Sequence, residues 1–264
     1  MKLITWNINS VRLRMPLLEK LTAEEAPDVV CLQEIKVHND LFPVEDIEAL
    51  GYGHMHFRGM KGYNGVAILS RLPFKTTNGK DFCGRSDCRH ASVAFEDGTT
   101  LHNFYVPAGG DVPDPDANDK FAHKLAFLDE MTEWFAKEHK SKNRAILVGD
   151  LNIAPLETDV WSHKQLLKVV SHTPVEVERL DAVQRSNNWI DAVRRFIPPE
   201  ETLYSWWSYR ARDWDAADKG RRLDHVWVTP PLESKLKSAK VLRPARGWEK
   251  ASDHAPVIVE LDAG

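Results

Sequence analysis

The sequence has few cysteines and no long apolar run, and both absences narrow the class of protein. Three cysteines in 264 residues cannot form a fully paired disulfide framework, and they fit a reducing compartment. The longest apolar stretches have the length of a strand, such as Val-Val-Cys-Leu at residues 29–32, far below the roughly 20 residues that cross a bilayer. Polar Asn7 follows the first strand-like residues, so the N-terminus lacks the apolar segment of a signal peptide. We therefore expect a cytoplasmic protein with no membrane segment.

The chain also lacks internal repeats, low-complexity segments and linkers rich in glycine and serine. Hydrophobic residues make up 42% and charged residues 28% of the sequence, which are ordinary globular values and argue against disorder or a coiled coil. A chain of this length can bury one large core. We predict one domain over residues 1–264.

The charge of the chain is unevenly distributed. The net charge of −4 gives no indication of a polyanionic partner. Residues 205–250, however, hold eleven Lys and Arg against six Asp and Glu, so this segment carries +5 and leaves −9 for the rest of the chain. A basic surface can attract phosphate backbones, although a solvated surface explains such a run about as well.

Segments rich in β-branched and aromatic residues predict several strands. They cover residues 3–8, 28–33, 65–69, 91–96, 100–106, 145–148, 225–228 and 257–261. Asp97-Gly98 separates two of these strands and is typical of a hairpin turn, because both residues tolerate a positive φ.

Helical periodicity is clearest over residues 119–138, where an apolar stripe follows a cap at Asn118 or Asp119. A second helix is expected after Ser10. Residues 109–119 contain prolines and acidic side chains and predict an exposed loop, which is either a lid or an ordinary connection.

Polar side chains occur at the ends of the predicted strands. Those that follow a strand are Asn7, Glu34, Tyr105, Asp150 and Asn152, and those that precede one are Asp224, Asp253 and His254. All of them share one edge if the strands of the second group run opposite to those of the first, as a mixed sheet allows. Oxygen ligands at one edge, with positions left for water and phosphate, are what a hard divalent cation requires.

Each of these residues also has a purely structural explanation. Asn7 and Asn152 could be turn residues, whereas Glu34 and Asp150 could cap helices or form ion pairs. Only the joint pattern favours function.

Zinc is a separate question. Cys83, Cys88 and His90 lie close in sequence, but no second pair of ligands at the usual spacing completes a site. We expect ordinary thiols.

Seven short motifs follow one another along the chain. They are residues 5–9 (TWNIN), 31–36 (CLQEIK), 65–70 (GVAILS), 103–107 (NFYVP), 149–152 (GDLN), 222–225 (RLDH) and 252–256 (SDHAP). Together they resemble the exonuclease–endonuclease–phosphatase superfamily, and within it the exonuclease III type of DNA-repair nuclease. This resemblance spans nearly the whole chain. It implies an α/β fold, a four-layer sandwich of two packed mixed β-sheets flanked by helices.

The resemblance also implies a metal site. Glu34 would be the main ligand of Mg²⁺, with Mn²⁺ as an alternative, while Asn7 would lie beside it and Asp253 in its outer surroundings. The metal would neutralise phosphate charge and stabilise the leaving 3′ oxygen.

The catalytic residues carried over from the family are Tyr105, Asp150, Asn152, Asp224 and His254. Asp150 would orient and deprotonate the attacking water, and Asn152 would hold a phosphate oxygen. Asp224 would orient His254, whose second ring nitrogen could then donate to the phosphate. Tyr105 would donate to the phosphate or assist the leaving group. The resemblance does not decide which of Asp150, His254 and Tyr105 transfers which proton.

Aromatic and basic residues point to the substrate. The run 204–210 (YSWWSYR) resembles the family segment that lines the pocket for an extruded abasic sugar, with Trp206 in that position and Trp207 expected in the core. The residues expected to contact DNA are Asn64, Trp206, Arg210, Arg221 and Trp248.

The resemblance therefore implies a 3′→5′ exonuclease of base excision repair that also cuts at abasic sites and removes 3′-phosphates. Its partner would be duplex DNA, including abasic or 3′-blocked DNA, and we expect a monomer. One departure concerns phosphate contacts, because Ala108 stands where the family often has an amide side chain.

Two alternatives stay open. One is an enzyme of the same superfamily that acts on RNA tails, inositol phosphates or sphingomyelin. The other is a non-catalytic nucleic-acid-binding module, which predicts loss of the metal and water-activating residues, and no such loss is visible.

Overall fold

The computed structural model describes residues 1–262, and two β-sheets form its centre. The first sheet has six strands in the order β13-β14-β1-β2-β4-β3. Their bounds are Leu236–Val241 (β13), Val257–Leu261 (β14), Lys2–Asn7 (β1), Val29–Gln33 (β2), Val66–Ser70 (β4) and His54–Arg58 (β3). Strand β2 is parallel to β1, whereas β14 is antiparallel to it, so the sheet is mixed.

The second sheet also has six strands, in the order β5-β6-β7-β8-β12-β9. Their bounds are Phe74–Asn78 (β5), His90–Phe95 (β6), Thr100–Tyr105 (β7), Ala145–Asp150 (β8), Asp224–Val228 (β12) and Ile190–Asp191 (β9). Strand β8 is parallel to β7 and antiparallel to β12. A separate two-stranded ribbon consists of β10 (Trp206–Trp207) and β11 (Gly220–Arg221).

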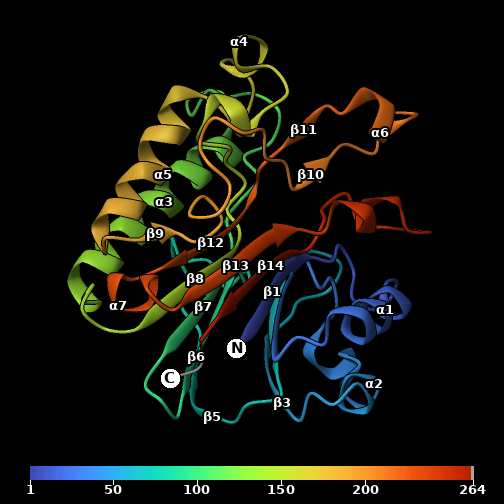
Figure 1. Cartoon of the computed structure of the whole chain (residues 1–264). Helices are drawn as coiled ribbons and strands as arrows, with labels where there is room; N and C mark the ends of the chain where they lie inside the picture. Colours follow the sequence, from blue (N-terminus) through green and yellow to red (C-terminus); the bar gives the residue numbers. More distant parts are fainter. Residues whose placement is uncertain (263–264) are drawn as a thin grey trace.

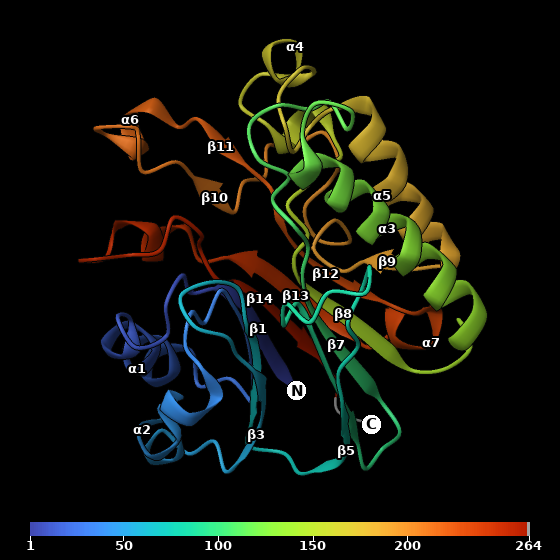
Figure 2. The same cartoon turned by 180° about the vertical axis from the view of Figure 1, so that it is seen from behind.

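Helices cover the outer faces of both sheets, which gives the four layers seen in Figures 1 and 2. Helices α1 (Met15–Glu25) and α2 (Val44–Ala49) pack on the first sheet, and α3 (Asp119–Glu138) and α5 (Pro174–Ser186) pack on the second. The short helices are α4 (His163–Leu166), α6 (Trp214–Ala217) and α7 (Pro230–Glu233). The four-layer α/β sandwich expected from the sequence is confirmed.

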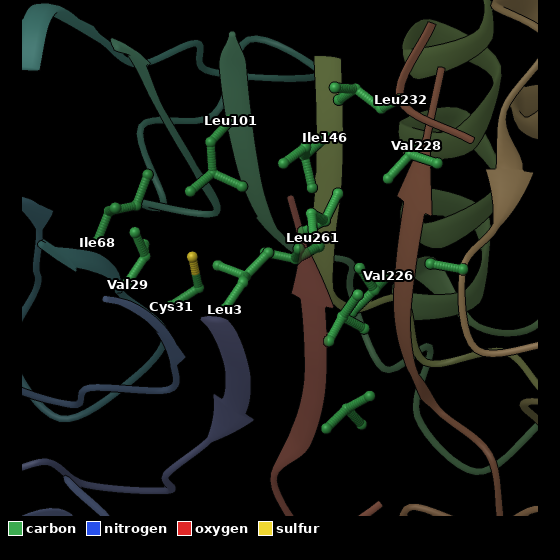
Figure 3. Packing of buried hydrophobic residues seen from close by; sticks show 14 of the residues in the cluster. Leu3, Val29, Cys31, Ile68, Leu101, Ile146, Val226, Val228, Leu232 and Leu261 are labelled. Atoms are coloured by element: carbon green, nitrogen blue, oxygen red, sulfur yellow. The ribbon is translucent and has the colours of Figure 1, made fainter. Parts of the chain in front are cut away.

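Successive side chains of a strand point to opposite faces of its sheet, and the strands therefore contribute to three apolar layers. One layer lies between the two sheets, and one lies between each sheet and its helices. In β1, Leu3 faces the second sheet, whereas Ile4 and Trp6 face the helices. Figure 3 shows Leu3 and Val29 of the first sheet packed opposite residues of the second sheet such as Ile146. Strands buried on both faces have nearly continuous apolar sequences, which is why these strands were predictable.

The predicted elements occur with bounds within two residues of those observed, including the hairpin between β6 and β7 and the helix α3. The side chain of Asn118 caps α3 by accepting from the backbone of Lys120. The sequence analysis missed the ribbon strands β10 and β11, and it missed β3, β5, β9 and β13 in the sheets. The missed sheet strands lie at sheet edges, and most residues of β5 and β13 are exposed or half-buried, so their apolar pattern is weak. Helix α5 was missed too, although Thr173 and Glu176 form a capping box at its start.

Buried amides join the two sheets just below one edge. Gln33 of β2 donates to Asn103 Oδ1 of β7 over 2.6 Å. Asn103 in turn donates to the carbonyl oxygens of Leu32 and Ala67 in the first sheet. These hydrogen bonds fix the position of one sheet on the other where the polar residues converge. Among residues 1–262, no helix has both the length and the apolar character needed to cross a membrane.

Candidate active site

Six strands bring the predicted polar residues to one edge of the sandwich. The parallel pairs β1/β2 and β7/β8 end there, whereas β12 and β14 start there because they run in the opposite direction. Tyr105 and Asp224 are both register partners of Asp150. The strand directions predicted from the sequence are thus confirmed.

Backbone geometry at this edge is special. Glu34 has φ 49° and Asn152 has φ 55°, a left-handed conformation that costs side chains on the order of 1 kcal/mol each and often marks functional sites. Gly149 precedes Asp150, and a Cβ atom there would lie 1.9 Å from the carbonyl oxygen of Phe104. Glycine is therefore required for β8 to approach β7 at this point.

Asn7 links two carboxylates. Its Nδ2 donates to Glu34 Oε1 and to Asp150 Oδ2, both over 2.9 Å. The second oxygen of Glu34 lies 2.7 Å from the Lys36 ammonium. Burial raises the pKa of Glu34, but the hydrogen bonds from Asn7 and Lys36 outweigh this effect and hold the pKa below its usual value. Glu34 is therefore an ionised carboxylate at neutral pH.

Asp224, His254 and Asp150 form a buried chain of charges. Asp224 Oδ2 lies 2.8 Å from His254 Nδ1, and His254 Nε2 lies 3.7 Å from Asp150 Oδ2. Burial alone would lower the pKa of His254, but Asp224 and Asp150 raise it to about 10. Burial raises the pKa of Asp150 to about 7 against the lowering effect of His254. The histidine is thus an imidazolium between two carboxyl groups, and burial raises the pKa of Asp150 above the ordinary value of an aspartate.

Asn152 and Tyr105 complete the floor of the site. Asn152 Nδ2 donates to the carbonyl oxygen of Val106 over 2.9 Å and to Asp150 Oδ2 over 3.2 Å. Burial raises the pKa of Tyr105 well above its ordinary value, and Glu34 and Asp150 raise it further. The phenol therefore keeps its proton and can donate a hydrogen bond.

These residues lie in a cleft of about 850 Å³ whose lining includes Glu34, Tyr105, Asp150, Asn152, Asp253 and His254. The opposite wall belongs to the segment that carries β10, α6 and β11, which projects from the sandwich in Figures 1 and 2. Trp206 contributes an apolar surface, and the Arg221 guanidinium lies 5.3 Å from its ring centroid. Arg210 is exposed at the same wall. Trp207 is buried, as expected for a core residue.

Two of the predicted DNA contacts lie outside this cleft. Asn64 lines a neighbouring cleft of about 450 Å³ on the other side of Tyr105. Trp248 packs near α1, where the Lys20 ammonium lies 4.7 Å from its ring. The structure therefore brings Trp206, Arg210 and Arg221 together but not Trp248.

The sequence analysis missed three residues that hold this site in place. Asn9 Nδ2 donates to Asp253 Oδ1 over 3.1 Å, and Lys36 contacts both Asn9 and Glu34. Ser205 Oγ donates to Asp224 Oδ2 over 2.7 Å. All three lie within or beside the quoted segments, so the motifs contained the signal, but only the fold shows the contacts.

The donor atoms fit a divalent metal ion. Glu34 offers an ionised carboxylate that lines the cleft, and hard cations prefer such oxygen ligands. Asp253 lines the same cleft, and its two oxygens accept hydrogen bonds from Asn9 and Trp206. Asn7 points its Nδ2 toward Glu34, and in this orientation it positions the ligand.

A second group of candidate ligands is less suitable. Asp150, Asp224 and His254 have ligand atoms within 4.8 Å of one another. A metal requires a neutral imidazole, so a cation bound there would have to displace the proton that the two carboxyl groups hold on His254. No group in residues 1–262 includes Cys83, Cys88 or His90, and His90 instead contacts His102 in the core.

Known proteins are similar to this chain in sequence and in architecture. Residues 4–254 match the Endonuclease/Exonuclease/phosphatase family. Exodeoxyribonuclease III of Haemophilus influenzae is 31% identical over 99% of this chain and 100% of its own length. An AP endonuclease from Archaeoglobus fulgidus superposes with a TM-score of 0.92 at 30% identity. The 3′ phosphatase NExo from Neisseria, bound to a product DNA hairpin, gives 0.91 at 30% identity, and both structures and this chain are covered completely.

The chain belongs to the endonuclease/exonuclease/phosphatase family, as its two packed sheets and its polar edge already indicate. Within this family it is an exonuclease III-type nuclease of DNA repair. Enzymes of this type depend on a metal ion, and the site contains a group of acidic and histidine side chains that could hold one.

Proposed function

We propose that residues 1–264 form one catalytic domain, a monomeric Mg²⁺-dependent phosphodiesterase of duplex DNA. It removes nucleotides from 3′ ends, releases 3′-phosphates and cuts beside abasic sites. The observation that carries this proposal is the chain of hydrogen bonds and charges that joins Glu34, Asn7, Asp150, His254 and Asp224 at the floor of one cleft. The names of the exodeoxyribonuclease, AP endonuclease and 3′ phosphatase relatives support it.

Glu34 would hold the metal directly, with Asn7 and Asp253 around it. When bound, Mg²⁺, or Mn²⁺ in its place, supplies positive charge for the phosphate and for the leaving 3′ oxygen. The hydrogen bonds from Asn7 and from the Lys36 ammonium keep Glu34 ionised, so the carboxylate can bind a cation without first losing a proton.

Asp150 is the base in this proposal. Burial raises the pKa of Asp150 from its ordinary value toward the working pH, which favours a group that must accept a proton. Asn7 and the backbone of Asn152 hold the two carboxylate oxygens in fixed positions over 2.9 Å. Asp150 can therefore orient a water molecule and take its proton.

His254, Asn152 and Tyr105 stabilise the charged phosphate. Asp224 accepts at His254 Nδ1, so the free Nε2–H of the imidazolium can donate to a phosphate oxygen. Asn152 offers an amide without adding negative charge beside Asp150. The neutral Tyr105 hydroxyl adds another donor.

The cleft wall determines which nucleotides fit. Trp206 gives a flat apolar surface for an extruded sugar or a terminal nucleotide, and Arg210 and Arg221 lie beside it to hold the backbone. Asn64 and Trp248 would contact more distant parts of the duplex. Since Ala108 supplies no amide, the polypeptide backbone of the next two glycines would have to contact the phosphate.

The decisive experiment uses three duplexes, one blunt, one with a 3′-phosphate and one with a central abasic analogue. We expect cleavage of all three with Mg²⁺ and none with EDTA, because the carboxylates alone cannot neutralise the phosphate. Inositol phosphate and RNA serve as controls for the other substrates of the family. Hydrolysis of inositol phosphate with no cleavage of any duplex would remove the DNA proposal.

A further inference from the structure

Lys124 is a buried charge that the reaction described above does not use. It lies on the apolar face of α3 between Phe121 and Leu125, and its side chain is 0% exposed. Its ammonium lies 2.5 Å from Glu176 Oε1, and Glu176 is also 0% exposed. Burying an ion pair costs much of the free energy that its attraction returns, so such a pair is weak evidence for a role in stability.

The ammonium also contacts the two loops that border the cleft. It donates to the carbonyl oxygen of Asn152 over 2.8 Å and to that of Ala108 over 3.3 Å. The left-handed backbone of Asn152 is thus held by a charged donor. The aliphatic part of Lys124 passes close to Gly109, where a Cβ atom would lie 2.9 Å from Lys124 Cδ. The loop that contains Ala108 and Gly109 therefore packs directly against this side chain.

Glu176 extends the same contacts to a third loop. Its carboxylate accepts from the backbone of Ser171 over 2.9 Å, and from the backbone and hydroxyl of Thr173 over 3.1 and 2.7 Å. The Ser171 hydroxyl in turn accepts from Arg221 over 2.7 Å, and Arg221 lies over Trp206. One ion pair therefore connects the floor of the cleft to its far wall.

We propose that Lys124 is a positioning residue, which holds the Asn152 loop and the Ala108 loop in the geometry that the reaction needs, with Glu176 as its anchor. This inference rests on the proposed function, because it concerns the rate of that reaction. Lys124 touches no reacting atom. Its loss should therefore lower kcat through displaced groups, and the DNA-binding wall at Arg221 and Trp206 should stay in place as long as position 176 still accepts from Ser171.

The test is the double variant Lys124→Met with Glu176→Gln, which leaves no unpaired buried charge. Gln keeps an acceptor for Ser171 and Thr173, so only the donors to Ala108 and Asn152 are lost. We expect kcat to fall roughly 10–100-fold, as displacements of about 1 Å do, with KM within about twofold.

The matched control is Arg194→Met with Asp159→Asn. This pair is also buried, at 2.6 Å, and Arg194 also donates to two loop carbonyl oxygens, those of Pro198 and Glu201. Both double variants should lose thermal stability, but the control should keep kcat within about twofold because its loop lies outside the cleft. Equal kcat values in the two folded double variants would overturn the proposal.

A second variant and a second substrate complete the test of Lys124. If Lys124→Met with Glu176→Gln does not fold, Lys124→Gln with Glu176→Gln replaces the ion pair by two amides and removes the ammonium that holds the Ala108 and Asn152 carbonyl oxygens, and an unchanged kcat would then refute the positioning role. The rates are measured on DNA and on bis(4-nitrophenyl) phosphate with Mg²⁺. A wild type that hydrolyses only the small diester refutes the DNA substrate but still tests Lys124.

Discussion

Replacing Asp224 by Asn tests the source of the positive charge on His254. Burial by itself lowers the pKa of His254, and Asp224 is the main group that raises it to about 10. The side chain of Asn has nearly the same shape, and Ser205 can still donate to its oxygen. Without the Asp224 carboxylate, burial acts against Asp150 as the main remaining group that raises the pKa of His254, and we expect this pKa to fall toward the ordinary value of about 6.5.

The magnitude follows from that shift. At pH 8 the charged fraction of His254 falls from nearly one to about 0.03, which predicts a loss in kcat of about 30-fold from protonation alone. At pH 6 a fraction of about 0.8 stays charged, so the loss from protonation nearly disappears. An amide that donates to Nδ1 would add a loss that does not depend on pH, because it selects the wrong tautomer.

The assay is the ratio of variant to wild-type kcat on the blunt duplex at pH 6 and pH 8, with circular dichroism to confirm folding. Asp191→Asn is the control, because Asp191 is a half-buried carboxylate of the same sheet that pairs with Arg222 and not with His254. A ratio for Asp224→Asn that is the same at both pH values would refute the role of Asp224 in charging His254.

Three further predictions concern other groups of the site and core. Asp150→Asn should bind DNA and metal normally but lose about 10²–10⁴-fold in kcat, the usual contribution of a general base, and a near-normal rate would show that the water is activated elsewhere. Glu34→Ala should raise the Mg²⁺ concentration needed for half-maximal activity, and an unchanged metal titration would place the metal on other ligands. His102 and His225 are buried, and burial lowers their pKa values to about 3. In the unfolded chain a histidine has a pKa of about 6.5, so the unfolded chain binds more protons than the folded chain at acidic pH. Lowering the pH from 7.5 to 5 should therefore cost about 2 kcal/mol of unfolding free energy for each histidine. Urea unfolding checks this, and a difference between wild type and His102→Gln that does not change with pH would contradict it.

Local sequence predicted much of the fold for a simple reason. Strands buried on both faces, such as β2 and β8, need apolar side chains at almost every position, and α3 needs one apolar stripe. Edge strands such as β13 face solvent and pair through backbone groups, so their side chains are unconstrained and their sequence carries little information.

The candidate site was predictable as a set of residues because its polar side chains lie at strand ends, within short motifs that resemble those of a known family. Glu34, Asp150 and His254 all lie in such motifs. The sequence also placed a lysine on the apolar stripe of α3, but a charged residue in that position has many explanations. Nothing local indicates that Lys124 reaches Glu176, 52 residues away.

The sequence by itself determined which residue types were available and where the buried strands would form. The tertiary structure alone decided the distances, such as 2.9 Å from Asn7 to Asp150 and 2.8 Å from Asp224 to His254. It also decided the burial of these charges, because the strength of an interaction between charges depends on water excluded by side chains from distant parts of the chain. For that reason the pKa values of Asp150 and His254, and with them their chemistry, belong to the folded molecule.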